Sequence, residues 1–362
     1  GDQFIDVYTV GFTTSPFANS VLEKTAQVGN GDFFFSNNAE ELADSIVEAV
    51  SDIIQKSQAF TAATVPAART ASGGKFYTSL FVPSDRTAYW EGHLKSWEIT
   101  ASGEIRDRLG NCALDDPTPG QCYSGAFLSS AEPCWDAGGV LDARSPASRD
   151  LYTSKLTATP GVADREEFLH TSEAGVLTAA DLEVTYPPGS TYPGSVATDA
   201  EELAAEVIAN VRGCEFGTGA NGVACTERVW KLGDIFHSNP VVVPGPSSWV
   251  FSPSYKAFRA AWSTRDRMIV AGANDGFFRI WNAGTWDAGL TPPDYDEGTG
   301  AEVAGFMPYA ARKNAKELAV DTGSRDFYFV DGSPSVADVW FYTNPIVAPQ
   351  AADGSEWRTI VV

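Results

Sequence analysis

The chain has 362 residues, of which 43% are hydrophobic and 20% charged, a composition typical of a folded protein of two or three domains. Its formal net charge of -22 argues against a nucleic-acid partner, because phosphates would meet few positive side chains. The same acidic surface suits solubility outside a cell and contact with divalent cations. No apolar run approaches membrane-spanning length, so we expect no segment that crosses a bilayer.

Residues 1–56 alternate between strand and helix patterns, as in an α/β fold. Apolar runs over 4–12 and 32–36 predict two strands of a parallel sheet. The Ser-Val-Leu-Glu sequence at 20–23 predicts the capping box of a helix that ends at Gly29. Asn38 opens a longer helix whose apolar face consists of Leu42, Ile46, Val50, Ile53 and Ile54. Because these elements make only half of a doubly wound sheet, we expect the chain to begin inside a larger protein.

Residues 57–110 alternate apolar and polar side chains between Pro and Gly, which predicts antiparallel β structure. Six large apolar side chains supply its expected core: Phe76, Leu80, Phe81, Trp90, Leu94 and Trp97. Such a row of aromatic residues also fits a carbohydrate-binding platform. Tryptophan in a β domain is more often part of the core.

Residues 111–229 are rich in loops and hold all five cysteines of the chain. Cys112 and Cys122 enclose one short loop, and Cys214 and Cys225 enclose another. We therefore predict two local disulfides and an oxidising compartment, with Cys134 left unpaired. A zinc site is the alternative, but there is no Cys-x-x-Cys and the three histidines are scattered: His93, His170 and His237.

The same region contains one predicted helix. Asp199 and Glu202 form its capping box, and Gly213 ends it. Four apolar residues recur with helical spacing on one face: Leu203, Val207, Ile208 and Val211.

From Trp230 to the end, short β-branched or aromatic runs are each followed by a turn sequence, which predicts an all-β domain. In the clearest hairpin, 268–271 and 277–281 flank Asn-Asp-Gly at 274–276, residues that accept positive φ. One hairpin cannot bury its own apolar face, and Trp-rich hairpins at roughly forty-residue spacing are typical of a propeller. Any quinoprotein-like or WD40-like propeller would explain the hairpin alone.

Several motifs follow one another along the chain. They are F-x-P-S…W-x-G-x-L-x-x-W at 81–97, W-x-A-G-x-x-L…R-x-x-Y-T at 135–153, L-G-D-I at 232–235, H-S-N-P-V at 237–241, G-A-N-D-G at 272–276, V-D-G-S-P at 330–334 and W-R-T at 357–359. In this order they resemble the PilY/PilC-type proteins, calcium-binding adhesins and assembly factors of type IV pili. Residues 5–50 also resemble the last part of a von Willebrand factor A domain. Its metal-binding motif would lie upstream, so no metal ligand is assigned there.

The resemblance implies an α+β, mostly β chain of three segments. These are the C-terminal part of a von Willebrand factor A-like domain (1–56), a β-rich linker domain with cysteine-bounded loops (57–229), and the first blades of a quinoprotein-like β-propeller (230–362). It also implies an extracellular, non-enzymatic adhesin or assembly factor at the pilus tip. Its expected partners are minor pilins and a host or abiotic surface.

For calcium, the candidate ligands are Asp294 and Asp296, because the acidic spacing of 294–302 begins like an EF-hand loop. The loop lacks the distal glutamate, and a solvated insertion between two propeller strands explains the same residues. The resemblance implies that the main calcium loop lies beyond Val362. The chain has no G-x-S-x-G, P-loop or H-E-x-x-H motif that would indicate an enzyme. Two alternatives remain open, a periplasmic or secreted quinoprotein-like propeller enzyme and a carbohydrate-binding β module.

Overall fold

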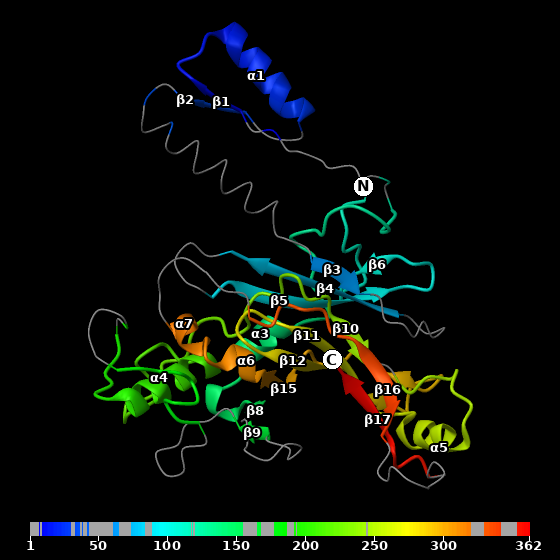
Figure 1. Cartoon of the computed structure of the whole chain (residues 1–362). Helices are drawn as coiled ribbons and strands as arrows, with labels where there is room; N and C mark the ends of the chain where they lie inside the picture. The colour runs from blue at the N-terminus through cyan, green and yellow to red at the C-terminus, as the bar shows by residue number, and fades with distance from the viewer. Residues whose placement is uncertain are drawn as a thin grey trace. The chain divides into compact units, whose positions relative to one another are not determined.

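The structure is a computed structural model that separates into two compact units, Gly1–Gln58 and Ala59–Val362. The residues that it describes are 7, 9–29, 33–36, 38, 42, 61–64, 74–83, 89–116, 118, 120–154, 165–167, 177–186, 192, 194–243, 245–319, 329–341 and 353–362. Figure 1 shows the elements of both units in chain order.

The first unit is a strand, helix, strand motif. β1 (Thr9–Phe12) pairs in parallel with β2 (Phe33–Ser36), and α1 (Pro16–Val28) connects them. The predicted order is therefore confirmed, but the predicted capping box at 20–23 is wrong. Ser15 caps the helix by accepting from the Ala18 amide at 3.3 Å, while Pro16 begins the first turn, where its missing N–H costs nothing. The second predicted helix, 38–54, lies outside the described residues except at Asn38 and Leu42.

The second unit begins with an antiparallel sheet, as predicted for 57–110. Its strands are β3 (Thr61–Thr64), β4 (Gly74–Val82), β5 (Glu91–Ile99), β6 (Ile105–Arg106) and β7 (Trp135–Asp136). Four predicted core residues are buried, namely Leu80, Phe81, Leu94 and Trp97, whereas Phe76 and Trp90 are half-buried. The Trp97 indole donates to the Thr78 hydroxyl at 2.9 Å. This burial favours the core interpretation over a carbohydrate platform.

A six-stranded sheet forms the centre of the second unit, in the order β10-β11-β12-β15-β8-β9. The first four strands pair antiparallel and β8 joins β15 in parallel. β8 and β9 come from the segment 57–229, and the other four strands come from the segment 230–362. Two segments that the sequence suggested as separate domains therefore share one sheet. Its members are β10 (Val241–Val243), β11 (Arg267–Gly272), β12 (Phe278–Gly284), β15 (Glu302–Met307), β8 (Leu151–Ser154) and β9 (Arg165–Glu167).

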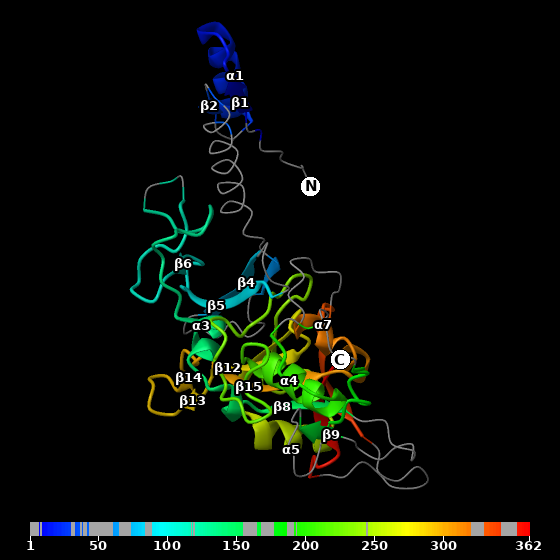
Figure 2. The same ribbon diagram turned by 90° about the vertical axis from the view of Figure 1, so that its left-hand side faces the viewer.

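The two sheets pack against each other. Figures 1 and 2 show β4 and β5 lying over β11, β12 and β15. One hydrophobic cluster joins the layers, with Tyr77 and Leu94 from the antiparallel sheet and Ile269 and Trp281 from the six-stranded sheet. This shared core explains why both sheets belong to one compact unit.

The predicted hairpin is confirmed as β11 and β12, but only part of its turn behaves as expected. Gly276 has φ 97°, while Asn274 and Asp275 are not among the residues with positive φ. These two residues act through their side chains instead. The Asn274 amide donates to Asp234 at 2.8 Å, and Asp275 accepts from the Gly233 amide at 2.8 Å.

The predicted helix at 200–212 is confirmed as α4 (Ala200–Arg212). Asp199 accepts from the Glu202 amide at 2.9 Å, Gly213 ends the helix at φ 123°, and the predicted apolar face is buried. The remaining helices among the described residues are shorter. They are α3 (Ala137–Asp142), the single turn η1 (Pro146–Ser148), α5 (Pro253–Trp262), α6 (Tyr309–Arg312) and α7 (Ala315–Ala319).

Two small ribbons complete the described structure: β13 (Trp286–Asp287) with β14 (Asp294–Tyr295), and β16 (Val336–Trp340) with β17 (Trp357–Val361). The protein is thus mixed α/β with a predominance of sheet, in agreement with the coarse class expected. The von Willebrand A-type and propeller assignments stay predictions. None of the described helices has the length and apolar character needed to cross a bilayer.

Candidate functional site

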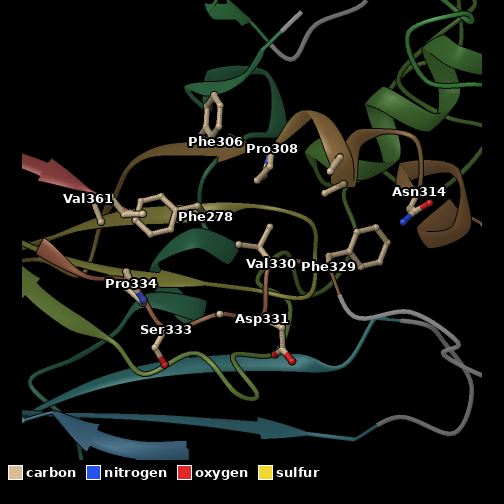
Figure 3. A pocket seen from close by; sticks show the side chains of 14 residues that line it. Phe278, Phe306, Pro308, Asn314, Phe329, Val330, Asp331, Ser333, Pro334 and Val361 are labelled. Atoms are coloured by element: carbon tan, nitrogen blue, oxygen red, sulfur yellow. The ribbon is translucent and has the colours of Figure 1, made fainter. Parts of the chain in front are cut away.

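An apolar groove of about 540 Å³ lies between the six-stranded sheet and the ribbon of β16 and β17 (Figure 3). β12 contributes Phe278 and β15 contributes Phe306, which pair directly across the two strands. The loop 329–334 and the end of β17 form other parts of the wall. Because aromatic and aliphatic side chains dominate the lining, the groove suits an apolar ligand or peptide segment.

The loop 329–334 is held in place by the H-S-N-P motif. The His237 amide donates to Asp331 at 3.1 Å, and the His237 ring contacts the other oxygen of the same carboxylate. The Asn239 amide donates to the Ser333 hydroxyl at 3.0 Å. Hydrogen bonds therefore join two motifs that lie 94 residues apart, along one side of the groove.

Behind the groove lies a buried network of four charged side chains. The Arg149 guanidinium donates to both oxygens of Glu302, at 2.9 and 3.0 Å. Arg279 also donates to Glu302 and reaches Asp275 at 2.6 Å. Each of these side chains is at most 1% exposed. The network ties β12 and β15, the strands that carry Phe278 and Phe306, to the segment before β8.

The charge balance of this network depends on Glu302. Burial by itself would raise the pKa of this carboxyl, but the guanidinium groups of Arg149 and Arg279 outweigh burial and lower the pKa of Glu302 to about 2. The carboxylate therefore stays ionised at neutral pH. A buried ion pair of this kind is costly to break, because removing one partner leaves the other charge uncompensated.

The predicted calcium ligands occupy the β13–β14 ribbon and the loop after it. Asp296 is exposed, and its Oδ1 accepts from the amides of Thr285 at 2.7 Å and Gly298 at 2.9 Å. Asp294 accepts from the Tyr295 amide at 2.8 Å. These hydrogen bonds give both aspartates a structural role, since they order the ribbon and the loop after it. In the part of the chain that the structure describes, no group of three or more His, Cys, Asp or Glu could hold a metal ion, and the calcium site stays a prediction.

The structure joins Cys112 to Cys122 and Cys214 to Cys225, and leaves Cys134 free. Burial raises the pKa of the Cys134 thiol to about 11, so this group is a poor nucleophile at neutral pH. Two of the histidines considered for zinc lie in separate pairs, His93 with Asp136 at 2.7 Å and His237 with Asp331. The third, His170, lies outside the described residues.

The groove residues Phe278 and Phe306 were not identified from the sequence. In the structure, Phe277 and Arg279 are fully buried while Phe278 between them is half-buried, but the sequence F-F-R does not show this difference in burial. This alternation places Phe278 on the face opposite to its neighbours. The position of Phe306 beside it depends on the pairing of β12 with β15, which the sequence pattern does not reveal.

These features define a class: a sheet-rich protein of an oxidising compartment, with two disulfides and an apolar groove suited to docking. Comparison with known proteins narrows the class. The chain is 25% identical over 354 residues to the type IV pilus biogenesis factor PilY1 of Pseudomonas aeruginosa (strain UCBPP-PA14), which covers 92% of this chain and 24% of that protein. It is 28% identical over 116 residues, or 30% of this chain and 8% of the relative, to the PilY1 homolog of Xylella fastidiosa (strain Temecula1). The resemblance to PilY-type proteins is therefore confirmed.

The chain spans about a quarter of the length of the PilY1 protein that it matches over most of its residues. No protein-family model matches it, and no solved structure does. The disulfides and the relatives together indicate an extracellular or periplasmic location.

Proposed function

We propose that this protein acts in type IV pilus biogenesis, as a non-enzymatic adhesin and assembly factor at the pilus tip that binds minor pilins and a target surface. The observation that carries the proposal is the 25% identity to a type IV pilus biogenesis factor across 92% of the chain. A similarity of that extent involves both compact units and nearly all of the motifs, and it does not depend on one hairpin.

We also propose that residues 230–362 begin a β-propeller, and the sheet topology supports this fold. β10, β11, β12 and β15 form a four-stranded antiparallel meander, which is the form of a propeller blade. β16 and β17 would begin the next blade. In the first unit, the parallel pair of β1 and β2 joined by α1 is compatible with the end of a von Willebrand A-type domain.

Exposed aromatic side chains support the proposed binding of minor pilins and a target surface. Trp249 is 82% exposed, Phe251 is 70% exposed and Trp262 is 53% exposed, all next to or within α5. Large apolar groups that remain in solvent are typical of surfaces that contact another molecule, and tryptophan is enriched among the residues that contribute most to binding.

Deleting the gene for this protein in its own organism, and counting surface pili by electron microscopy, tests the proposal. We expect fewer pili than in the parent strain, with recovery when the gene is restored. Purified minor pilins should also be retained by the immobilised protein. A normal pilus count together with no retention would overturn the proposal.

A further inference from the structure

We propose that the segment between β10 and β11 binds the surface of an anionic lipid bilayer through aromatic and basic side chains around α5. These side chains form the α5 patch, which consists of Trp249, Phe251, Lys256, Arg259 and Trp262. The inference rests on the proposed function in one respect, because it names the chemistry of the target surface. The contacts and charges that carry it do not depend on the pilus.

The α5 patch belongs to an insertion between two neighbouring strands. β10 and β11 pair directly, so a short turn could join them, yet residues 244–266 stand between them. The Arg259 guanidinium donates to the Ser248 carbonyl at 3.3 Å, which brings the loop before α5 against the helix. Trp249 follows Ser248 directly, and Trp262 comes about one turn after Arg259. The two tryptophans therefore lie near the same basic residue.

The aromatic side chains of the patch remain in solvent. Trp249, Phe251 and Trp262 are each more than half exposed. Burying such rings against an apolar phase is favourable. Tryptophan in particular prefers the interface of a bilayer, where its ring meets acyl chains and its N–H meets the headgroups.

The buried face of α5 is a different set of residues, and the ribbon of β16 and β17 covers it. Ser254 and Tyr255 both contact Trp357, at the start of β17. Figure 1 shows α5 at this end of β17 and the C-terminus at the other end. A segment that followed Val362 would therefore begin at the end of the strand that is remote from α5.

Charge distinguishes the α5 patch from the rest of the chain. The protein has a net charge of -22, yet residues 235–265 contain no aspartate or glutamate. Lys256 is exposed and Arg259 is half-buried, and the two lie about one turn apart on α5. Asp266, the next acidic residue, stands between two arginines. The patch is thus locally positive, which favours an anionic partner.

The acidic remainder of the chain does not prevent this contact. At physiological salt the Debye length is about 8 Å, so charges that lie farther from the lipid are largely screened. Basic side chains close to the lipid decide the electrostatic part, each strengthening binding about fivefold. Exposed aromatic rings beside long basic side chains fit a lipid surface better than an acidic polysaccharide or protein, because the rings enter the acyl boundary while the charged heads reach phosphates.

The first experiment measures co-sedimentation of the complete chain with lipid vesicles. Vesicles that mix phosphatidylcholine with phosphatidylglycerol should retain the protein, and vesicles of phosphatidylcholine alone should retain it at least about fivefold more weakly. N-bromosuccinimide should oxidise Trp249 and Trp262 in the free chain and oxidise them less when the mixed vesicles are present, as mapped by mass spectrometry. The inference fails if the mixed vesicles retain no protein, if both kinds of vesicle retain it equally, or if both tryptophans are already protected in the free chain.

The second experiment compares variants of the patch with matched variants elsewhere. W249A removes an apolar ring and should weaken binding to the mixed vesicles about tenfold or more. K256E reverses one charge and should weaken it at least about fivefold. The controls are Y123A and K313E, which change an exposed aromatic and an exposed lysine outside the patch and should leave binding unchanged. All four side chains are exposed, so the variants should keep the fold, and circular dichroism checks this. Equal binding by the patch variants and their controls would count against the site.

Other occupants of the patch give different results. Retention of the chain by immobilised heparin but not by the mixed vesicles would overturn the lipid assignment in favour of an acidic polysaccharide. A dimer that W249A dissociates would show that a second copy covers the patch, and would overturn it as well.

The same measurements separate this inference from the proposed function. Minor pilins retained equally by the original chain and by W249A, with no vesicle binding by either, would support the pilus role and overturn the lipid site. Vesicle binding that depends on Trp249 and Lys256, with no retention of minor pilins and a normal pilus count after gene deletion, would support the lipid site and remove the pilus role.

Discussion

Glu302 is the residue on which the buried charge network depends, because it accepts from both Arg149 and Arg279. Replacing it with glutamine leaves two buried guanidinium groups with less compensating charge. We expect E302Q to lower the free energy of unfolding by about 3–5 kcal/mol, measured by urea denaturation. D150N is the matched control. Asp150 pairs with Arg144 but is 58% exposed, so its loss should cost less than about 1 kcal/mol. Equal effects of the two variants would contradict this account of the network.

The depressed pKa of Glu302 also predicts how stability depends on pH. The pKa of its carboxyl falls from 4.5, the ordinary value, to about 2 in the folded protein. The unfolded state therefore binds the proton more readily, and acid favours unfolding. The stability that this group contributes is fully present above pH 4.5 and is lost as the pH falls toward about 2. Melting temperatures measured across this window should fall more steeply for the original protein than for E302Q.

At the scale of single elements, the two Asp-Gly turns respond differently to an added methyl group. Gly276 has φ 97°, and a Cβ there would lie 2.5 Å from the Met307 side chain. G276A should therefore destabilise the protein by about 1–2 kcal/mol or more. A Cβ at Gly332 would meet nothing within 4 Å, so G332A should be close to neutral. Thermal unfolding of the two variants makes the comparison, and an equal cost would show that the β11–β12 turn is not strained.

The disulfide-bounded loops offer a second test at this scale. Cys214 and Cys225 close a loop with a sequence separation of 11, and removing that cross-link should cost about 3 kcal/mol through the greater freedom of the unfolded chain. The double variant C214S/C225S is compared by urea denaturation with C134S, which removes only the free thiol. Thiol titration of the denatured, unreduced protein should find one reactive cysteine. More than one would contradict the disulfide pairing.

How far the elements were predictable depends on how local their signals are. The β11–β12 hairpin and α4 were predicted because turn residues, caps and apolar periodicity all lie within the element. The start of α1 was misplaced because Ser15 and Pro16 form a cap that competes with the box at 20–23. The pairing of β8 with β15 joins residues such as Leu151 and Gly305, and nothing local to either strand indicates it. The groove depends on that kind of pairing, so its residues could not be read from the sequence.

At the scale of the whole molecule, the sharing of strands between residues 57–229 and residues 230–362 predicts that these two segments fold together. β8, from the segment 57–229, covers the edge of β15, and Arg149 from the same segment supplies one of the two guanidinium groups on Glu302. A fragment of residues 230–362 would lose both. It would expose a strand edge and leave part of a buried charge uncompensated, each of which destabilises a small domain.

We therefore expect residues 230–362 alone to give a poorly dispersed NMR spectrum and no cooperative urea transition, whereas residues 59–362 should unfold cooperatively. The comparison isolates the contribution of the segment before residue 230, because both fragments contain the same ribbons and the same turn sequences. A cooperative transition in the shorter fragment would mean that the meander of β10, β11, β12 and β15 is stable without β8. The charge network would then be a consequence of packing between two independent domains and not a condition for folding.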